Sequence, residues 1–208
     1  MDDTPTVFIV DDDQELCAAL RWLLESEGLR VELYHSGEEY LAAFDPRRPG
    51  VLVLDVRMDG MSGLELHKQL IERGFAIPVI FLTGHGDVPM AVDSIKAGAV
   101  DFLQKPVHDV TLIERINEAM RLDARRRRAL EENKELLARF ERLTPREWEV
   151  LGLVVEGRAN KQIAAILHIS EKTVEVHRKH VMSKLQAQSV AELVRMVITR
   201  DAVESRAR

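Results

Sequence analysis

Short apolar runs alternate with longer amphipathic stretches along the first half of the chain. Val51–Leu54 and Val79–Leu82 are apolar without interruption, which is typical of strands covered on both faces of a sheet. The stretches between the runs carry apolar residues at helical spacing. This alternation predicts right-handed βαβ units around a parallel sheet. The other expected strands are Val7–Val10, Val31–Tyr34 and Asp101–Leu103, and the expected helices are Gln14–Glu27, Gly37–Phe44, Gly63–Arg73 and Val88–Ala97.

The pattern changes after Pro106, where helices replace strands. One helical pattern continues without Gly or Pro from about Thr111 to Leu143. Helix-start signals then mark four further helices. These are a helix from Thr144-Pro145 that ends before Gly157, then about Lys161–Leu167, then Glu171–Leu185 capped by Ser170, and a last helix opened by Ser189 and Glu192. We therefore expect an α/β domain at 1–122, a helical linker at 123–142 and an all-α domain at 143–208.

The linker is strongly charged. Residues 125–128 are all arginine, and the last two of them stand four residues before a glutamate. This spacing favours Arg–Glu ion pairs along a solvated helix. The expected pairs are Arg127–Glu131 and Arg128–Glu132. A dimer-forming coiled coil is the alternative, since Leu130 and Leu137 lie one heptad apart, although charged residues interrupt that seam.

Charge is divided unequally between the two halves. The chain has a net charge of −6, made up of −10 over residues 1–108 and +4 over residues 109–208. An acidic half joined to a basic half indicates two domains with different partners, of which the basic one suits nucleic acid. The single cysteine, Cys17, excludes an internal disulfide and a multi-cysteine zinc site. With no membrane-length apolar run and no secretory signal, we expect a cytoplasmic protein without a membrane partner.

Polar side chains follow the expected strands where each strand ends. Asp11 and Asp12 come after the first strand, Asp55 after the third, Thr83 after the fourth and Lys105 after the fifth. Open parallel sheets form their binding crevice at the carboxyl ends of the strands. Residues scattered over the chain are therefore expected to meet at one edge of the sheet.

Phosphoryl transfer to a carboxylate is the chemistry that fits these residue types. An aspartate such as Asp55 can act as a nucleophile and form an acyl phosphate. Mg²⁺ prefers hard oxygen ligands, which Asp12 and Asp55 supply, with Asp11 nearby. A lysine and a hydroxyl, here Lys105 and Thr83, can bind the transferred oxygens. Because clustered carboxylates repel one another, the cluster itself also argues for a bound cation.

Four motifs stand in order at the ends of the expected strands: Val10-Asp11-Asp12-Asp13, Leu54-Asp55-Val56-Arg57-Met58, Thr83-Gly84-His85-Gly86-Asp87 and Phe102-Leu103-Gln104-Lys105-Pro106. On these motifs, residues 5 to about 122 resemble the receiver domain of two-component response regulators. The resemblance implies a flavodoxin-like, doubly wound, five-stranded parallel sheet whose Asp55 is phosphorylated by a sensor histidine kinase. It implies that Mg²⁺ is held by Asp12, Asp55 and the backbone carbonyl of Arg57, with Asp11 accessory.

The same resemblance implies a switch and a backbone feature. Thr83 would rotate toward the phosphate and Phe102 would follow it inward, and Lys105-Pro106 would be a cis peptide. One position departs from the family, since Asp59 stands where proline is usual. This change loosens the loop after Asp55 and adds a negative charge near the metal. His85 and Arg57 flank the site, and our hypothesis is that both tune the lifetime of the phosphate.

Three pieces of the last third mark a helix-turn-helix, namely Leu143-Thr-Pro-Arg-Glu147, Asn160-Lys-Gln-Ile-Ala164 and Lys172-Thr-Val-Glu-Val-His-Arg178. On these pieces, about 143–205 resembles the LuxR-type helix-turn-helix of the FixJ/NarL subfamily. A helix-turn-helix places its second helix in the major groove of DNA. The resemblance implies that Glu175, Val176 and Lys179 face base edges, and that Asn160, Lys161, Lys172, Thr173, Arg178 and Lys184 approach phosphates. For each of these residues alone, a solvated surface position is the competing interpretation.

Together the two resemblances imply a transcriptional response regulator. Phosphorylation of Asp55 would alter domain arrangement or dimerisation, and thereby binding to double-stranded promoter DNA. A homodimer is expected after phosphorylation, with part of the last helix as a two-fold surface. RNA polymerase is retained as a further partner.

Two other classes remain in view. An aspartate-dependent phosphohydrolase typically has a second aspartate two positions after its nucleophile, but this chain has Arg57 there. A phosphorylation-independent DNA-binding adaptor would not need the set Asp55, Thr83 and Lys105. No glycine loop of the Walker type is present in the sequence, which argues against ATP-driven promoter opening.

Overall fold

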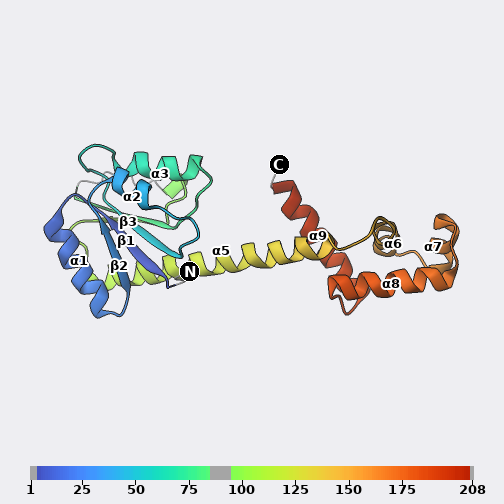
Figure 1. The fold of residues 1–208 in the computed structure, drawn as a ribbon. Coiled ribbons are helices and arrows are strands. Elements are labelled where there is room, and N and C mark those ends of the chain that lie inside the picture. The colour runs from blue at the N-terminus through green and yellow to red at the C-terminus, as the bar shows by residue number, and fades with distance from the viewer. Residues whose placement is uncertain (1–3, 85–94, 207–208) are drawn as a thin grey trace. The chain divides into compact units, whose positions relative to one another are not determined.

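The structure is a computed structural model that describes residues 4–84 and 95–206. The chain divides into two compact units, the first reaching Arg127 and the second beginning at Arg128. Figure 1 draws both units as a ribbon and labels most of their helices and strands. Within the described ranges, no helix combines the length and apolarity that crossing a membrane requires.

The first unit contains a five-stranded sheet in which all neighbouring pairs are parallel. The strand order is β2-β1-β3-β4-β5, which confirms the flavodoxin-like, doubly wound fold expected from the sequence. From β1 the chain adds β2 on one side of the sheet and then β3, β4 and β5 on the other side. The ligand crevice of such a fold lies where the order reverses, beside β1 and β3. The strands are β1 (Thr6–Val10), β2 (Arg30–Tyr34), β3 (Gly50–Leu54), β4 (Val79–Thr83) and β5 (Asp101–Gln104).

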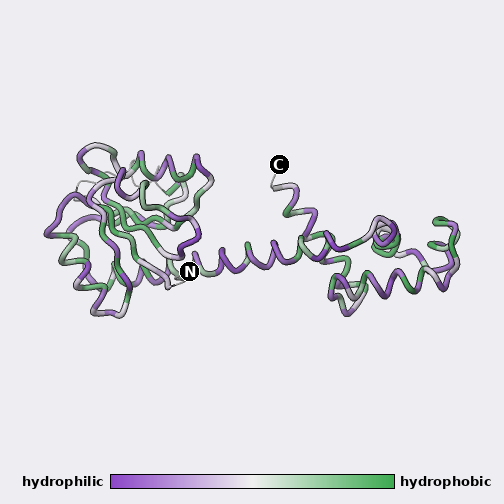
Figure 2. The backbone as a smooth tube through the Cα atoms, viewed as in Figure 1, coloured by the Kyte–Doolittle hydropathy of each residue, from purple (hydrophilic) through white to green (hydrophobic). Residues whose placement is uncertain are grey.

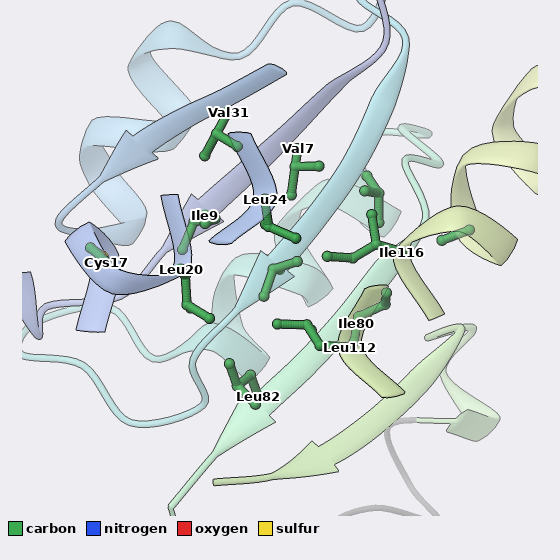
Figure 3. Packing of buried hydrophobic residues seen from close by; sticks show 13 residues of the cluster. Val7, Ile9, Cys17, Leu20, Leu24, Val31, Ile80, Leu82, Leu112 and Ile116 are labelled. Atoms are coloured by element: carbon green, nitrogen blue, oxygen red, sulfur yellow. The ribbon is translucent and has the colours of Figure 1, made fainter. Parts of the chain in front are cut away.

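Helices cover both faces of this sheet. Residues of α1 (Gln14–Ser26) and α5 (Asp109–Phe140) pack on one face, where Cys17, Leu24 and Ile116 meet strand residues (Figure 3). The helices α2 (Gly37–Ala43) and α3 (Gly63–Glu72) supply the core of the other face. Figure 2 shows hydrophobic residues concentrated on the strands, while the helices alternate between hydrophobic and hydrophilic positions. This two-layer covering explains why the central strands are continuously apolar.

The helices end close to the expected positions. In α1, α2 and α3 the last residue precedes the expected end by one, because Glu27, Phe44 and Arg73 are the C-cap residues. Ser62 and Glu65 form the expected capping box at the start of α3. The expected helix Val88–Ala97 falls largely on residues 85–94, which lie outside the described residues.

The hydroxyl of Tyr40 offers a stability test of the core. It is buried among aromatic rings, and no group in residues 4–84 and 95–206 forms a hydrogen bond with it. We expect Tyr40→Phe to raise the free energy of unfolding by about 1 kcal/mol, because an unpaired buried hydroxyl is costly. Tyr34→Phe is the matched control, since the Tyr34 hydroxyl donates to Glu32 at 3.1 Å and its loss should destabilise slightly. Urea unfolding measures both, and a destabilised Tyr40→Phe would contradict the expectation.

The second unit is helical, as expected. Its core joins the end of α5 to the following helices, with Phe140 stacked on Trp148 at 5.5 Å between ring centroids. His168, at the end of the first helix of the helix-turn-helix, adopts a left-handed conformation (φ 53°), which ends that helix. The four helices after α5 are α6 (Pro145–Val155), α7 (Asn160–Leu167), α8 (Glu171–Leu185) and α9 (Val190–Arg206).

The helix α5 is continuous over 32 residues and belongs to both units. Asp123 and Arg127 hold the middle of α5 to the first unit. The Asp123 carboxylate accepts from the Gly50 N–H at 3.0 Å and from Arg127 at 2.7 Å. The expected Arg128–Glu132 pair is present at 2.9 Å. The expected Arg127–Glu131 pair is wrong, since Arg127 instead bonds Asp123 and the carbonyls of Pro46, Arg47 and Arg48.

Candidate functional site

The sheet brings the expected polar residues to one edge, as predicted. Backbone hydrogen bonds continue the ladder just past the strand ends and fix these residues in register. The Asp55 N–H donates to the Val10 carbonyl at 2.9 Å, and the Lys105 N–H donates to the Thr83 carbonyl at 2.8 Å. The Asp11 N–H likewise donates to a carbonyl of β2 at 3.1 Å.

Three carboxylates form a compact cluster at this edge. Asp11, Asp12 and Asp55 each offer an oxygen, and these oxygens lie within 4.8 Å of one another. Asp11 and Asp55 are buried, whereas Asp12 is exposed. The Lys105 ammonium lies 2.6 Å from Asp11 Oδ2 and 3.2 Å from Asp55 Oδ1. Two of the three acidic groups thus share one lysine and the cluster keeps an excess of negative charge, which an additional cation would balance.

Electrostatics at the cluster agree with this imbalance. Burial raises the pKa of Asp55, and the charge of Asp11 adds to this effect against the opposing charge of Lys105. Burial alone would lower the pKa of Lys105, but its hydrogen bond and charge interactions with Asp11 and Asp55 outweigh burial and raise it. The donors are all hard carboxylate oxygens, partly open to solvent through Asp12. This donor set fits Mg²⁺, which takes such ligands and retains water.

The loop between β3 and α3 closes around Asp55. A Cβ atom at Gly63 would lie 2.0 Å from the Asp55 carbonyl oxygen, so only glycine allows this close approach. Arg57 is exposed in this loop, and its carbonyl as a metal ligand stays a prediction. The Asp59 N–H donates to Asp12 Oδ2 at 3.0 Å, a contact that sequence reasoning missed. His85, also expected beside the site, lies outside the described residues.

The two expected switch residues lie on the neighbouring strands β4 and β5. Thr83 is buried at the end of β4. Phe102 is half-buried on β5, and its ring centroid lies 6.1 Å from that of Phe81. The Lys105–Pro106 peptide is cis, as the resemblance implied. The rotation of Thr83 and Phe102 stays a prediction.

The helix α8 presents the expected DNA-facing residues. Val174, Val181 and Leu185 are buried in the core of the second unit. The positions on the opposite side are exposed, and their i, i+3, i+4, i+7 spacing places them on one helix face. These are Lys172, Glu175, Val176 and Lys179. The other expected contact residues are exposed or partly exposed, namely Asn160, Lys161, Thr173 and Arg178.

Lys184 has an internal partner that the sequence did not reveal. Its ammonium bonds Glu147 Oε2 at 2.6 Å, across 37 positions of the chain. Glu147 is 3% exposed and also completes the capping box with Thr144 at the start of α6. The expected contact of Lys184 with DNA phosphate therefore competes with this ion pair. The capping spacing identified Glu147 as a helix-start residue, but no local signal identified Lys184 as its partner.

Glu147 makes the stability of the second unit depend on pH. Burial would raise its pKa, but hydrogen bonds from Lys184 and Thr144 outweigh burial and lower the pKa below the ordinary 4.5. A lowered folded-state pKa gives stability that is present above pH 4.5 and lost as pH falls through the folded value. Denaturant unfolding of wild type should thus lose more stability on acidification than unfolding of Glu147→Gln. Glu175→Gln, an exposed control, should behave as wild type, and equal acid sensitivity of all three would contradict the assignment.

Comparisons with known proteins cover both units. Residues 7–117 match the response regulator receiver domain family, and residues 141–197 match the luxR family of bacterial regulatory proteins. The transcriptional regulatory protein FixJ of Rhizobium meliloti (strain 1021) is 45% identical, over 93% of this chain and 95% of FixJ. The response regulator protein TmoT of Ectopseudomonas mendocina is 44% identical, over 94% of this chain and 89% of TmoT.

Two solved structures resemble the whole chain. The response regulator StyR has a TM-score of 0.88 at 46% identity, covering 93% of this chain and 98% of that one. Full-length FixJ from B. japonicum has a TM-score of 0.58 at 38% identity, covering 95% and 98%.

Proposed function

Because this chain belongs to the two-component response regulators that join a receiver to a LuxR-type DNA-binding domain, we propose that Asp55 is its phosphoacceptor. The protein is thus a transcriptional regulator of a two-component system, and the proposal concerns which residues carry out the regulation. The observation that carries it is the meeting of Asp11, Asp12, Asp55 and Lys105 at one sheet edge. These four residues are separated by up to 94 positions in the chain.

The chemistry follows from this arrangement. An Asp55 carboxylate oxygen attacks the phosphorus of a phosphohistidine on a sensor kinase, the P–N bond breaks, and an acyl phosphate forms. Asp12, Asp55 and the Arg57 carbonyl would hold Mg²⁺, with Asp11 accessory, and the bound ion would supply positive charge to neutralise the transferred group. Lys105, already 3.2 Å from Asp55, is placed to bind a phosphoryl oxygen. Thr83 supplies a hydroxyl for another oxygen.

The output is a change in DNA binding. The added phosphate carries charge and strong hydrogen-bond acceptors, which favour a different conformation around Thr83 and Phe102. The receiver then alters the availability of the DNA-binding domain or forms a homodimer. In that domain, the face of α8 with Glu175, Val176 and Lys179 reads bases, because these side chains are exposed on one side of the helix. The partners are a sensor kinase, promoter DNA and RNA polymerase.

Removal of metal tests the proposal directly. Incubation of the full chain with acetyl phosphate and Mg²⁺ should add the mass of one phosphoryl group, as read by intact-protein mass spectrometry. The same incubation with a chelator should add none, because the carboxylate cluster then repels the phosphodonor. DNA affinity, measured by fluorescence anisotropy, should change only in the sample with Mg²⁺. Labelling that proceeds equally without metal would overturn the proposed site.

A further inference from the structure

Asp12 is held differently from its neighbour Asp11. Asp11 is buried, accepts from the Asp13 N–H at 3.0 Å and pairs with Lys105. Asp12 is exposed, and within residues 4–84 and 95–206 its carboxylate has one hydrogen-bond donor, the Asp59 N–H at 3.0 Å. The contact joins the end of β1 to the loop after β3, across 47 positions. An exposed carboxylate has several accessible rotamers, and this bond favours the one seen in the structure.

We propose that Asp59 is a positioning residue that acts through its main-chain N–H to orient Asp12 toward Mg²⁺, an inference that rests on the proposed metal site. A carboxylate has two oxygens with about four acceptor positions. The N–H of Asp59 uses one position on Oδ2, which leaves Oδ1 and the second Oδ2 position for the ion. Groups behind a ligand that fix its orientation strengthen metal binding by reducing the freedom lost when the ion binds.

The N–H, rather than the side chain of Asp59, makes this contact. Among the described residues, the group of carboxylates close enough to share an ion contains Asp11, Asp12 and Asp55 but not Asp59. Proline is the one standard residue that lacks a main-chain N–H. We call the hydrogen bond from the Asp59 N–H to Asp12 the tether. Because receiver domains usually carry proline at this position, the tether distinguishes this chain from most of its family.

Three variants separate the N–H from the charge. Asp59→Ala and Asp59→Asn keep the N–H and remove the charge, whereas Asp59→Pro removes both. Titration calorimetry of the full chain with MgCl₂ gives the dissociation constant of each variant. Loss of one hydrogen bond to a carboxylate predicts roughly fivefold weaker Mg²⁺ binding for Asp59→Pro than for Asp59→Ala. If these two variants bind Mg²⁺ equally, or if the proline variant binds it more tightly, the proposal is overturned.

Repeating the Pro and Ala comparison in an Asp12→Ala background guards against a general effect of proline on the loop. There the ratio between the two variants should fall to about one, since the acceptor is gone. A ratio that stays near fivefold would assign the effect to loop distortion and sink the proposal.

A metal-free measurement keeps the tether separate from the proposed function. In the ¹⁵N-labelled full chain without Mg²⁺, the amide of Asp59 should exchange with water more slowly in wild type than in Asp12→Ala. Equal exchange rates would overturn the tether. Absence of Mg²⁺ binding in wild type would overturn the proposed metal site instead, whatever the exchange rates show.

Discussion

Replacing Asp55 by asparagine is expected to abolish phosphoryl transfer to this protein while leaving its fold intact. The amide has no anionic oxygen to attack phosphorus, so intact-protein mass spectrometry after acetyl phosphate and Mg²⁺ should detect no added phosphoryl group. The change in DNA affinity that the phosphodonor produces in wild type should disappear with it. Both effects should be complete losses, since Asp55 is the proposed nucleophile and its amide analogue cannot replace it.

The fold should tolerate this substitution because the side chain keeps its size. Burial already disfavours the charge of Asp55 and raises its pKa, so an uncharged amide removes an unfavourable interaction from the metal-free protein. Lys105 loses one partner but keeps Asp11 at 2.6 Å. Thermal unfolding without Mg²⁺ should therefore show Asp55→Asn at least as stable as wild type. A large loss of stability would mean that missing phosphorylation reports unfolding.

Asp13→Asn is the matched control for Asp55→Asn. Asp13 is a neighbouring carboxylate outside the metal cluster, and its side chain caps α1 by accepting from two backbone N–H groups. Asparagine caps helices as well as aspartate does. This variant should accept phosphate as wild type does. Label that persists in Asp55→Asn, on Asp12 for instance, would show that the nucleophile has been misassigned.

The parts of the structure that the sequence predicted depend on local pattern or on strand direction. Uninterrupted apolar runs such as Val51–Leu54 identified the buried strands, and the Ser62 and Glu65 spacing identified a helix start. Convergence of Asp11, Asp55 and Lys105 was predictable because parallel strands end at the same edge. Each inference needs only the period of an element and its direction in the sheet.

The contacts that sequence reasoning missed are hydrogen bonds between distant segments, each with at least one side chain. Asp59 with Asp12, Lys184 with Glu147, and Arg127 with the loop at 46–48 join positions far apart in the chain. Periodicity cannot select such partners, because many charged residues of each sign lie on the surface. Local spacing favoured the wrong partner for Arg127. Glu131 and Asp123 both stand four residues from it along the helix, but Asp123 is buried and is the one that pairs with it.

Arg127 carries the second large expected effect, because it joins α5 to the first unit. Arg127→Ala should destabilise that unit by about 3 kcal/mol, the lower end for breaking a buried ion pair. Its Asp123 partner is 3% exposed in its side chain and would be left with the Gly50 N–H alone. Three carbonyls, of Pro46, Arg47 and Arg48, lose their donor as well. The lower end applies because the Arg127 side chain is 31% exposed, so water can replace part of what is lost.

Hydrogen exchange of β1 and β3 measures this effect within the first unit alone. Arg128→Ala is the control, since the neighbouring arginine is 83% exposed and pairs only with Glu132 among the described residues. A surface pair of this kind contributes about 0.5 kcal/mol or less. Equal effects of the two substitutions would show that Arg127 is an ordinary surface residue and that the first unit does not extend to it.

Arg127→Lys should recover little of the lost stability, and this outcome distinguishes geometry from charge. A lysine keeps the positive charge for Asp123 but lacks the planar guanidinium that reaches the carbonyls of 46–48 at the same time. If charge alone mattered, the lysine variant would restore wild-type exchange rates in β3, whose first residue, Gly50, shares the Asp123 carboxylate. If the several N–H donors of the guanidinium matter, the exchange rates of the lysine variant stay close to those of Arg127→Ala. Arg127 would then hold α5 to the first unit through its geometry and not through its charge alone.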